Sequence, residues 1–188
     1  MAGNLDNEHA RRRNRWSLAI WGGAASLLML PAVAMQFTDE VNWTAGDFVV
    51  MGAMLAVACG SYEVVARISS NRWYRIAAGI AIVTAFVTLW VNLAVGMLGS
   101  EDNPDNLLFG GVLAVGMIGA VIAWFRPQAM ARAMAATAVA QVAMTVYALT
   151  GGYAEVVLHV GAFVIPWAVS ARLFGKAARE HAEAGNSA

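Results

Sequence analysis

Short polar segments divide the chain into six apolar runs. The runs cover residues 16–37, 47–67, 76–98, 107–125, 129–149 and 155–174. About 20 apolar residues in a helix suffice to cross the hydrocarbon core of a bilayer, so each run is long enough to span it. The pattern predicts an all-α, polytopic membrane bundle of six transmembrane helices arranged as three helical hairpins.

Basic residues occur on only one side of this arrangement. Four lie in the tail 1–15, three between Arg67 and Arg75, two around Pro127 and three between Arg172 and Arg179, which accounts for all 12. Short cytoplasmic loops are rich in arginine and lysine. We therefore expect the N and C termini to be cytoplasmic, as a basic tail (1–15) and a second tail (175–188) around a transmembrane domain (16–174). The opposite loops hold acids: Asp39, Glu40, Asp47, Glu101, Asp102, Asp105 and Glu155.

The first run admits a second interpretation. Basic residues, an apolar stretch and the small-residue segment 31–34 follow one another, as they do in a cleavable signal peptide. Apolar character continues past Ala34 to Phe37. We therefore favour a membrane span, and cleavage would leave the later topology unchanged.

Composition supports the membrane assignment. The chain has 188 residues, of which 60% are hydrophobic and 13% charged, a balance outside the usual range of soluble domains. Its formal net charge is zero, so no nucleic-acid partner is predicted. The single cysteine, Cys59, excludes an internal disulfide.

Two helix starts carry capping signals. Thr44 and Asp47 have the spacing of a capping box before the second run. Before the fourth run, Asn103 suits an N-cap, Pro104 the first helical position, and Asp105 the positive end of the helix dipole.

The segment 100–106 is richer in oxygen-bearing side chains than capping requires. Calcium prefers such ligands, which makes Glu101, Asp102 and Asp105 weak candidates for a metal site. The segment lacks the regular acidic alternation and the glycine of an EF-hand, so capping is the favoured explanation and no metal site is predicted.

Four polar side chains within the apolar runs are candidates for a functional site: Glu63, Asn92, Gln141 and His159. An acid within the membrane suggests a proton carrier or a counter-ion, although a helical pair of Glu63 with Arg67 explains it more simply. Asn92 and Gln141 suit hydrogen bonds between helices. His159 suits an interfacial hydrogen bond, and a polar cavity shared with Asn92 is the alternative.

No motif of an enzyme or of a cofactor site occurs. The chain has no nucleophile elbow, zinc-binding HExxH, phosphate loop or paired intramembrane carboxylates. A bis-histidine haem is disfavoured because His9 and His181 lie across the membrane from His159. We predict no catalytic residues and no cofactor.

A weak internal repeat connects the first two hairpins. Asn14-Arg15-Trp16 matches Asn71-Arg72-Trp73, and Asp47 and Gly52 match Asp105 and Gly110 at a similar offset. A helical hairpin repeat explains the match, and chance similarity between apolar helices explains it equally well.

The segment Trp90–Gln141 resembles a group of small, uncharacterised proteobacterial integral membrane proteins. The resemblance rests on WVNLAVGMLGSEDNPDN and on the following glycine-rich run to Arg126-Pro127. It implies a multi-pass protein of the bacterial inner membrane and transfers no activity. The paired-helix plan is faintly similar to SPW-repeat membrane proteins, although the SPW triplet is absent.

Three function classes follow. The favoured one is a non-enzymatic accessory, structural or sensory protein, whose partners are the lipid bilayer, further copies of the chain or other membrane subunits. The alternative is a small carrier or channel for an ion or solute that uses Glu63 and an outer cluster around Asn92 and His159. An intramembrane enzyme ranks third.

Overall fold

The structure is a computed structural model that describes the backbone of residues 2–186 and the side chains of residues 16–185. These residues form helices joined by turns and contain no strand. Six helical segments are long and apolar enough to cross a membrane: Trp16–Ala34, Ala45–Ile68, Arg72–Ala94, Pro104–Ile122, Pro127–Thr150 and Ala154–Gly185. The predicted all-α arrangement of six membrane-spanning helices is confirmed on this basis.

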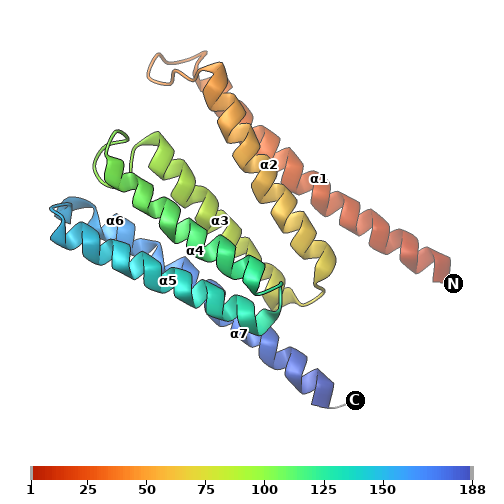
Figure 1. The fold of residues 1–188 in the computed structure, drawn as a ribbon. Coiled ribbons are helices and arrows are strands. Elements are labelled where there is room, and N and C mark those ends of the chain that lie inside the picture. The colour runs from red at the N-terminus through yellow and green to blue at the C-terminus, as the bar shows by residue number, and fades with distance from the viewer. Residues whose placement is uncertain (1, 187–188) are drawn as a thin grey trace. The chain divides into compact units, whose positions relative to one another are not determined.

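The chain divides into two compact units, Met1–Val64 and Val65–Ala188. The first unit holds α1 (Ala2–Ala34) and most of α2 (Ala45–Ile68), which form a hairpin (Figure 1). Leu28 of α1 lies beside Gly52 of α2. A Cβ atom added to Gly52 would be 3.7 Å from the Cδ2 atom of Leu28. Glycine at this position lets the Leu28 side chain approach the backbone of α2 closely.

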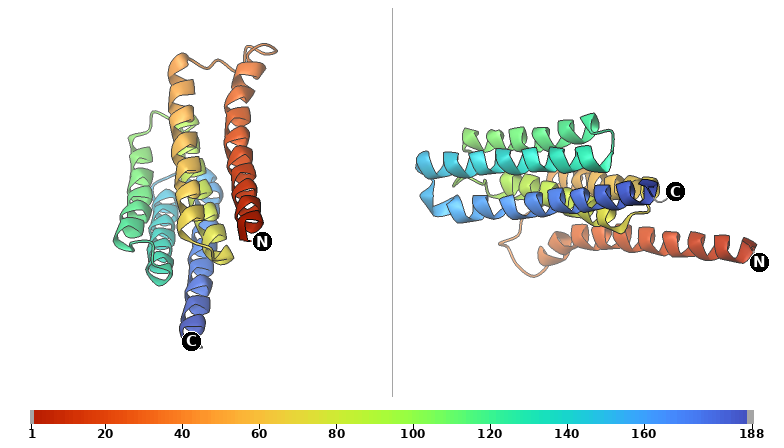
Figure 2. Two further views of the ribbon diagram at one scale, coloured as in Figure 1. Left: turned by 90° about the vertical axis from the view of Figure 1, so that its right-hand side faces the viewer. Right: turned by 90° about the horizontal axis from the view of Figure 1, so that it is seen from below.

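The second unit is a bundle of four spans. It contains α3 (Arg72–Ala94), the short η1 (Pro104–Leu107), α4 (Leu108–Ile122) and α5 (Pro127–Thr150). The last span consists of η2 (Ala154–Val156), α6 (Val157–Ala162) and α7 (Val164–Asn186). α5 packs between α4 and α7, and α7 also packs along α3 (Figures 1 and 2). The consecutive helices α3 and α4 contact each other much less than each contacts its other neighbour.

Small and polar side chains allow this packing. A Cβ atom on Gly119 of α4 would lie 2.8 Å from the Cβ of Ala133 on α5, so only glycine permits the observed approach. Between α7 and α3, the buried Ser170 hydroxyl donates a hydrogen bond of 2.9 Å to the carbonyl of Ala77. In lipid such a bond contributes about 0.6 kcal/mol.

We call the ends of the second unit the acidic side, formed by residues 95–106 and 151–156, and the basic side, formed by residues 68–75, 123–127 and the end of α7. The helix bounds differ most from expectation at the basic side. α3 begins at Arg72 instead of Ile76 because Asn71 caps it, accepting hydrogen bonds from the amides of Trp73 and Tyr74. Tyr74 is buried in the first turn of α3, and its hydroxyl donates to the carbonyl of Phe125 at 2.8 Å.

The last helix also extends further than expected. Residues 175–188 were predicted to be a charged tail, but α7 is helical through Asn186. Phe174 and Ala177 are buried against α3, with the rings of Phe174 and Tyr74 centred 4.9 Å apart. This burial stabilises the helix beyond the apolar run.

The sixth span is interrupted in the middle. α6 ends at Ala162 and α7 begins at Val164, with Phe163 between them. Pro166 lies in the first turn of α7, where its missing N–H leaves the carbonyl of Ala162 without a helical donor. The sequence analysis treated residues 155–174 as one continuous span and did not foresee this break.

Candidate functional site

The most elaborate polar structure of the chain is the loop 95–106 at the acidic side, which we call the asparagine loop. It begins at Gly96, whose φ of +72° is unfavourable for residues with a side chain. A Cβ atom at Gly96 would lie 2.3 Å from the carbonyl oxygen of Ser100. Glycine therefore allows the chain to turn back on itself directly after α3.

Asn106 holds the loop together from inside. Its side chain is only 4% exposed, and its Oδ1 accepts a hydrogen bond of 2.9 Å from the amide of Leu98. Its Nδ2 donates to the carbonyl of Ser100 at 2.6 Å. One side-chain amide thus satisfies two backbone groups that no regular secondary structure pairs.

Asn92 and Asn103 extend this network. Asn92 Nδ2 donates to the carbonyl of Asn106 at 3.0 Å, which ties the loop to α3. Asn103 caps η1 by accepting from the amide of Asp105 at 3.0 Å, and its Nδ2 donates to the carbonyl of Leu98 at 2.8 Å. The predicted N-cap at Asn103 and the position of Pro104 are confirmed, but they start η1 and not α4 directly.

Two tyrosines fasten the loop to α5. The hydroxyls of Tyr147, on α5, and Tyr153, in the following turn, both donate to Oδ2 of Asp105 at 2.8 Å. Asn103 Nδ2 also donates to the Tyr153 hydroxyl at 2.9 Å. Asp105 was expected to act through the helix dipole alone, but its carboxylate also joins two segments more than 40 residues away.

The remaining acids of the loop stay outside this network. Glu101 and Asp102 are exposed, and no hydrogen bond is shown for either carboxylate; the Asp102 amide donates to the Ser100 hydroxyl at 3.3 Å. Among the described residues, no group of three or more His, Cys, Asp or Glu side chains is arranged to hold a metal ion. Two exposed acids on a fixed loop can attract a positively charged partner.

Gln141 lies at the break in the sixth span. It is fully buried on α5, and its Nε2 donates to the carbonyl of Val160 at 2.9 Å. This bond between helices was predicted. Its Oε1 has no hydrogen-bond partner, and the same holds for the enclosed Oδ1 of Asn92. A buried acceptor without a partner costs about 1–3 kcal/mol, so these two atoms favour a bound donor or cation.

His159 lies on the short helix α6 and its side chain is exposed. Asn92 instead directs its Nδ2 into the asparagine loop. Among the described side chains no hydrogen bond joins His159 to Asn92, and the shared polar cavity stays a prediction.

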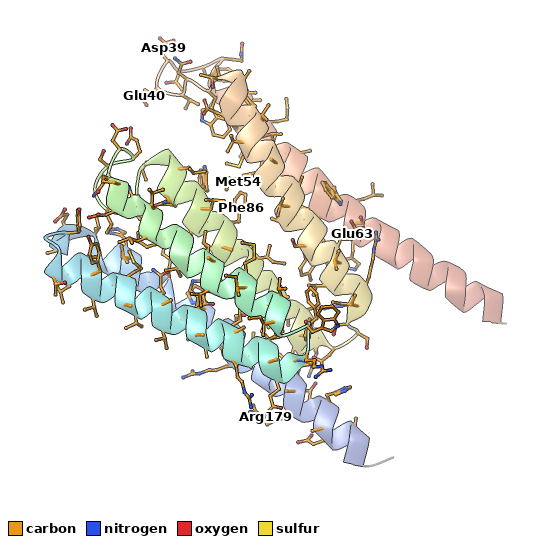
Figure 3. The ribbon with its side chains drawn as sticks, viewed as in Figure 1. Asp39, Glu40, Met54, Glu63, Phe86 and Arg179 are labelled. Carbon is orange, nitrogen blue, oxygen red and sulfur yellow. The ribbon has the colours of Figure 1, made fainter. Side chains whose placement is uncertain are left out.

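Glu63 belongs to the first unit, where it connects the two helices. Its Oε1 accepts a hydrogen bond of 2.9 Å from the Ser17 hydroxyl, and its Oε2 accepts one of 3.4 Å from the Trp21 indole. Figure 3 shows Glu63 on the side of α2 that faces α1. The acid therefore faces protein, as expected, and both donors come from α1.

Sequence reasoning missed the central residues of the site. It counted Asn106 only among the oxygen-bearing side chains of residues 100–106, and it predicted neither the turn at Gly96 nor a role for Tyr153. One signal was available: the segment 100–106 holds more amides and acids than a cap needs. The partners on α5 could not be inferred, because they lie more than 40 residues away.

The chain was compared with models of known protein families, with curated proteins and with solved structures, and it matches none of them. A proposal for the function therefore rests on the geometry of the described residues.

Proposed function

We propose that the chain is a non-enzymatic accessory protein of the bacterial inner membrane that binds partner subunits through the asparagine loop. The supporting observation is the contrast within this loop. Its amides and Asp105 are bonded to the protein itself, whereas Glu101 and Asp102 remain exposed. A loop fixed before binding loses little conformational entropy when a partner docks, which favours recognition.

The orientation in the membrane is part of this proposal. The distribution of basic residues places the asparagine loop on the side opposite the cytoplasm. A partner would meet two carboxylates there, so its contacting surface should be basic and include arginine or lysine. Other integral membrane subunits and the exterior domains of membrane-bound proteins have this access.

A carrier or channel for a small cation is the second candidate, favoured by a specific observation. The sixth span is broken at Phe163, Pro166 cannot supply the usual i+4 donor to the Ala162 carbonyl, and Gln141 Oε1 is buried without a partner on the neighbouring α5. Broken helices with free carbonyls form ion sites in many transporters. The engagement of Asn92 in the loop and the exposure of His159 favour the accessory function over this one.

Site-specific photo-crosslinking in native membranes tests the accessory function. A photoreactive amino acid at Asp102 should yield a discrete adduct with another protein, whereas the same residue at the exposed Ile122 on α4 should react with lipid only. The charge-reversal variant Glu101→Lys/Asp102→Lys should fold normally and lose the adduct. Absence of an adduct at Asp102, or an adduct unaffected by charge reversal, would contradict the proposal.

Flux measurements on proteoliposomes distinguish the carrier. For an accessory protein, wild type, Glu63→Gln and Gln141→Leu should all give background flux of sodium, potassium and protons. A flux above background that falls in Gln141→Leu would overturn the accessory assignment and establish a cation path at the break.

A further inference from the structure

Three segments of the second unit meet at the same level on the basic side. The Tyr74 hydroxyl, one turn into α3, bonds to the Phe125 carbonyl between α4 and α5 at 2.8 Å. The Tyr74 ring also packs edge-on against Phe174 of α7, with ring centroids 4.9 Å apart. Residues next to these contacts along the chain, including Arg72, Trp124 and Lys176, are therefore at a similar depth in the membrane.

The turn between α4 and α5 indicates how deep in the membrane these residues lie. Trp124 and Phe125 have backbone φ values of 48° and 58°, in the left-handed region that residues other than glycine rarely adopt. Their rings are exposed, at 77% and 47% respectively. Aromatic rings concentrate where the bilayer meets water, so this pair marks the level of the lipid headgroups.

Two cations lie on one aromatic ring at this level. The Lys176 ammonium is 3.6 Å and the Arg72 guanidinium carbon 4.6 Å from the centre of the Trp73 ring. Such contacts favour the cations and fix where they lie. They do not neutralise the charge.

Acidic partners for these two cations are missing within the described side chains. The only contacts recorded for Arg72 and Lys176 there are those with the Trp73 ring. The acid Glu180 follows Lys176 by one helical turn and keeps its negative charge, and its Oε2 accepts a hydrogen bond of 2.9 Å from Asn71 Nδ2. Neither Arg72 nor Lys176 forms an ion pair with a described side chain, and the two cations around the Trp73 ring carry more charge than this one acid offsets.

We propose that Arg72 and Lys176, positioned by Trp73, bind the phosphate of an anionic phospholipid headgroup. Arginine and lysine are the side chains that bind phosphate most strongly, and arginine does so with two parallel hydrogen bonds. Basic sites at the cytoplasmic ends of transmembrane helices bind anionic lipids in this way.

The surface below the cations favours a lipid over free phosphate. Ile76 follows Arg72 by one helical turn and Val83 follows Ile76 by two, so all three lie on one face of α3. Ile76 and Val83 are 46% and 61% exposed. A phospholipid can place its phosphate at Arg72 and an acyl chain along these two residues, a match that inorganic phosphate does not offer.

Native mass spectrometry of the full-length protein in detergent tests this site. Phosphatidylglycerol should be retained in preference to phosphatidylcholine with the same acyl chains, as at least one bound molecule. Each cation near a headgroup contributes about a fivefold change in affinity. The variant Arg72→Gln/Lys176→Gln should therefore lose roughly 25-fold, with the remaining affinity close to that for phosphatidylcholine.

Two matched variants separate the site from charge in general. Arg132→Gln/Arg179→Gln removes two exposed cations from the same side, neither of which contacts a ring, and should lower the affinity by less than about fourfold. The charge-conserving Arg72→Lys/Lys176→Arg should keep most of the preference, which also shows that the region tolerates substitution. Equal losses in the two charge-removing variants would overturn the proposal.

Competition with inorganic phosphate distinguishes the source of the anion. Phosphate at about 10 mM, in a buffer adjusted to roughly physiological ionic strength (about 0.15 M), should leave phosphatidylglycerol bound, because it lacks the acyl contacts. Displacement of the lipid by phosphate alone, or no preference for phosphatidylglycerol in the wild type, would contradict a lipid site.

Discussion

The loop between α1 and α2 and the loop between α3 and α4 both lead into a helix whose first turn holds an acid. In the first loop, Asp47 and Thr44 form the predicted capping box: Asp47 Oδ2 accepts from the Thr44 amide at 2.7 Å, and the Asp47 amide donates to the Thr44 hydroxyl at 3.3 Å. In the asparagine loop, Asp105 instead accepts from two tyrosines of distant segments. Similar acids at helix starts therefore have different structural consequences.

The contrast extends through both loops. The side-chain hydrogen bonds recorded within residues 38–47 join positions no more than three apart. The asparagine loop has bonds that span 14, 42, 48 and 50 residues. A loop held only by local bonds opens readily, whereas a loop bonded to a second helix opens only when that contact breaks. The asparagine loop should therefore be the more rigid of the two.

The largest expected effect is that of Gly96→Ala. The added Cβ would overlap the Ser100 carbonyl at 2.3 Å, and φ of +72° adds strain. We predict a loss of at least about 3 kcal/mol or failure to fold. Gly46→Ala in the other loop places its Cβ at an ordinary 3.4 Å from the Thr44 hydroxyl and should change stability by less than about 1 kcal/mol. Unfolding by SDS titration, followed by circular dichroism, measures both.

Asn106→Ala should have the next largest effect. It leaves the buried Leu98 amide without its partner, whereas the exposed Ser100 carbonyl keeps the Asn103 amide as a donor, so the loss should be about 1–3 kcal/mol. Thr44→Ala removes a capping residue at an exposed position and should cost about 1 kcal/mol. Thermal unfolding in one detergent compares the pair, and equal losses would show that the asparagine loop is no better fixed than its counterpart.

The tyrosine contacts should contribute less. Tyr147→Phe removes one hydrogen bond to Asp105 and should cost about 0.5–1.5 kcal/mol, and Tyr153→Phe removes a bond to Asp105 and one from Asn103 and should cost somewhat more, about 1–2 kcal/mol. Because both hydroxyls bond to the same oxygen, we expect the double variant to differ from the sum of the single ones. A double-mutant cycle measures this coupling. Additive losses would indicate that the two tyrosines act independently.

The smallest effect on stability is expected at the exposed acids. Glu101→Gln/Asp102→Gln and Asp39→Gln/Glu40→Gln should each change stability by less than about 0.5 kcal/mol. Figure 3 shows Asp39 and Glu40 in the loop between α1 and α2. Only the first pair should weaken partner crosslinking at the asparagine loop. Weakening by the second pair alone would move the partner surface to the other loop.

The sequence was sufficient for features that depend on local periodicity or spacing. The six apolar runs, the Thr44–Asp47 capping box and the Asn103 N-cap required only residues close together in the chain. It was insufficient where contacts between distant segments decide the outcome. The tyrosine contacts of Asp105, the burial of Tyr74 and the helical continuation of α7 past Phe174 all arise from packing between helices.

The break at Phe163 illustrates a second limit. Pro166 was visible in the sequence, but proline in the first turn of a helix and proline within a helix give the same local pattern. Which of the two forms depends on how α5 packs against the last span, where Gln141 donates to the Val160 carbonyl of α6. Contacts with another helix cannot be inferred from the apolar run alone.

Hydrogen–deuterium exchange in lipid nanodiscs tests the central claim, that the asparagine loop is a fixed surface, most directly. The amides of Leu98, Asp105 and Asn106 are hydrogen-bonded within the loop. They should exchange at least about 100-fold more slowly than the amides of residues 41–43 in the loop between α1 and α2. Exchange at the same rate in both loops would contradict the account.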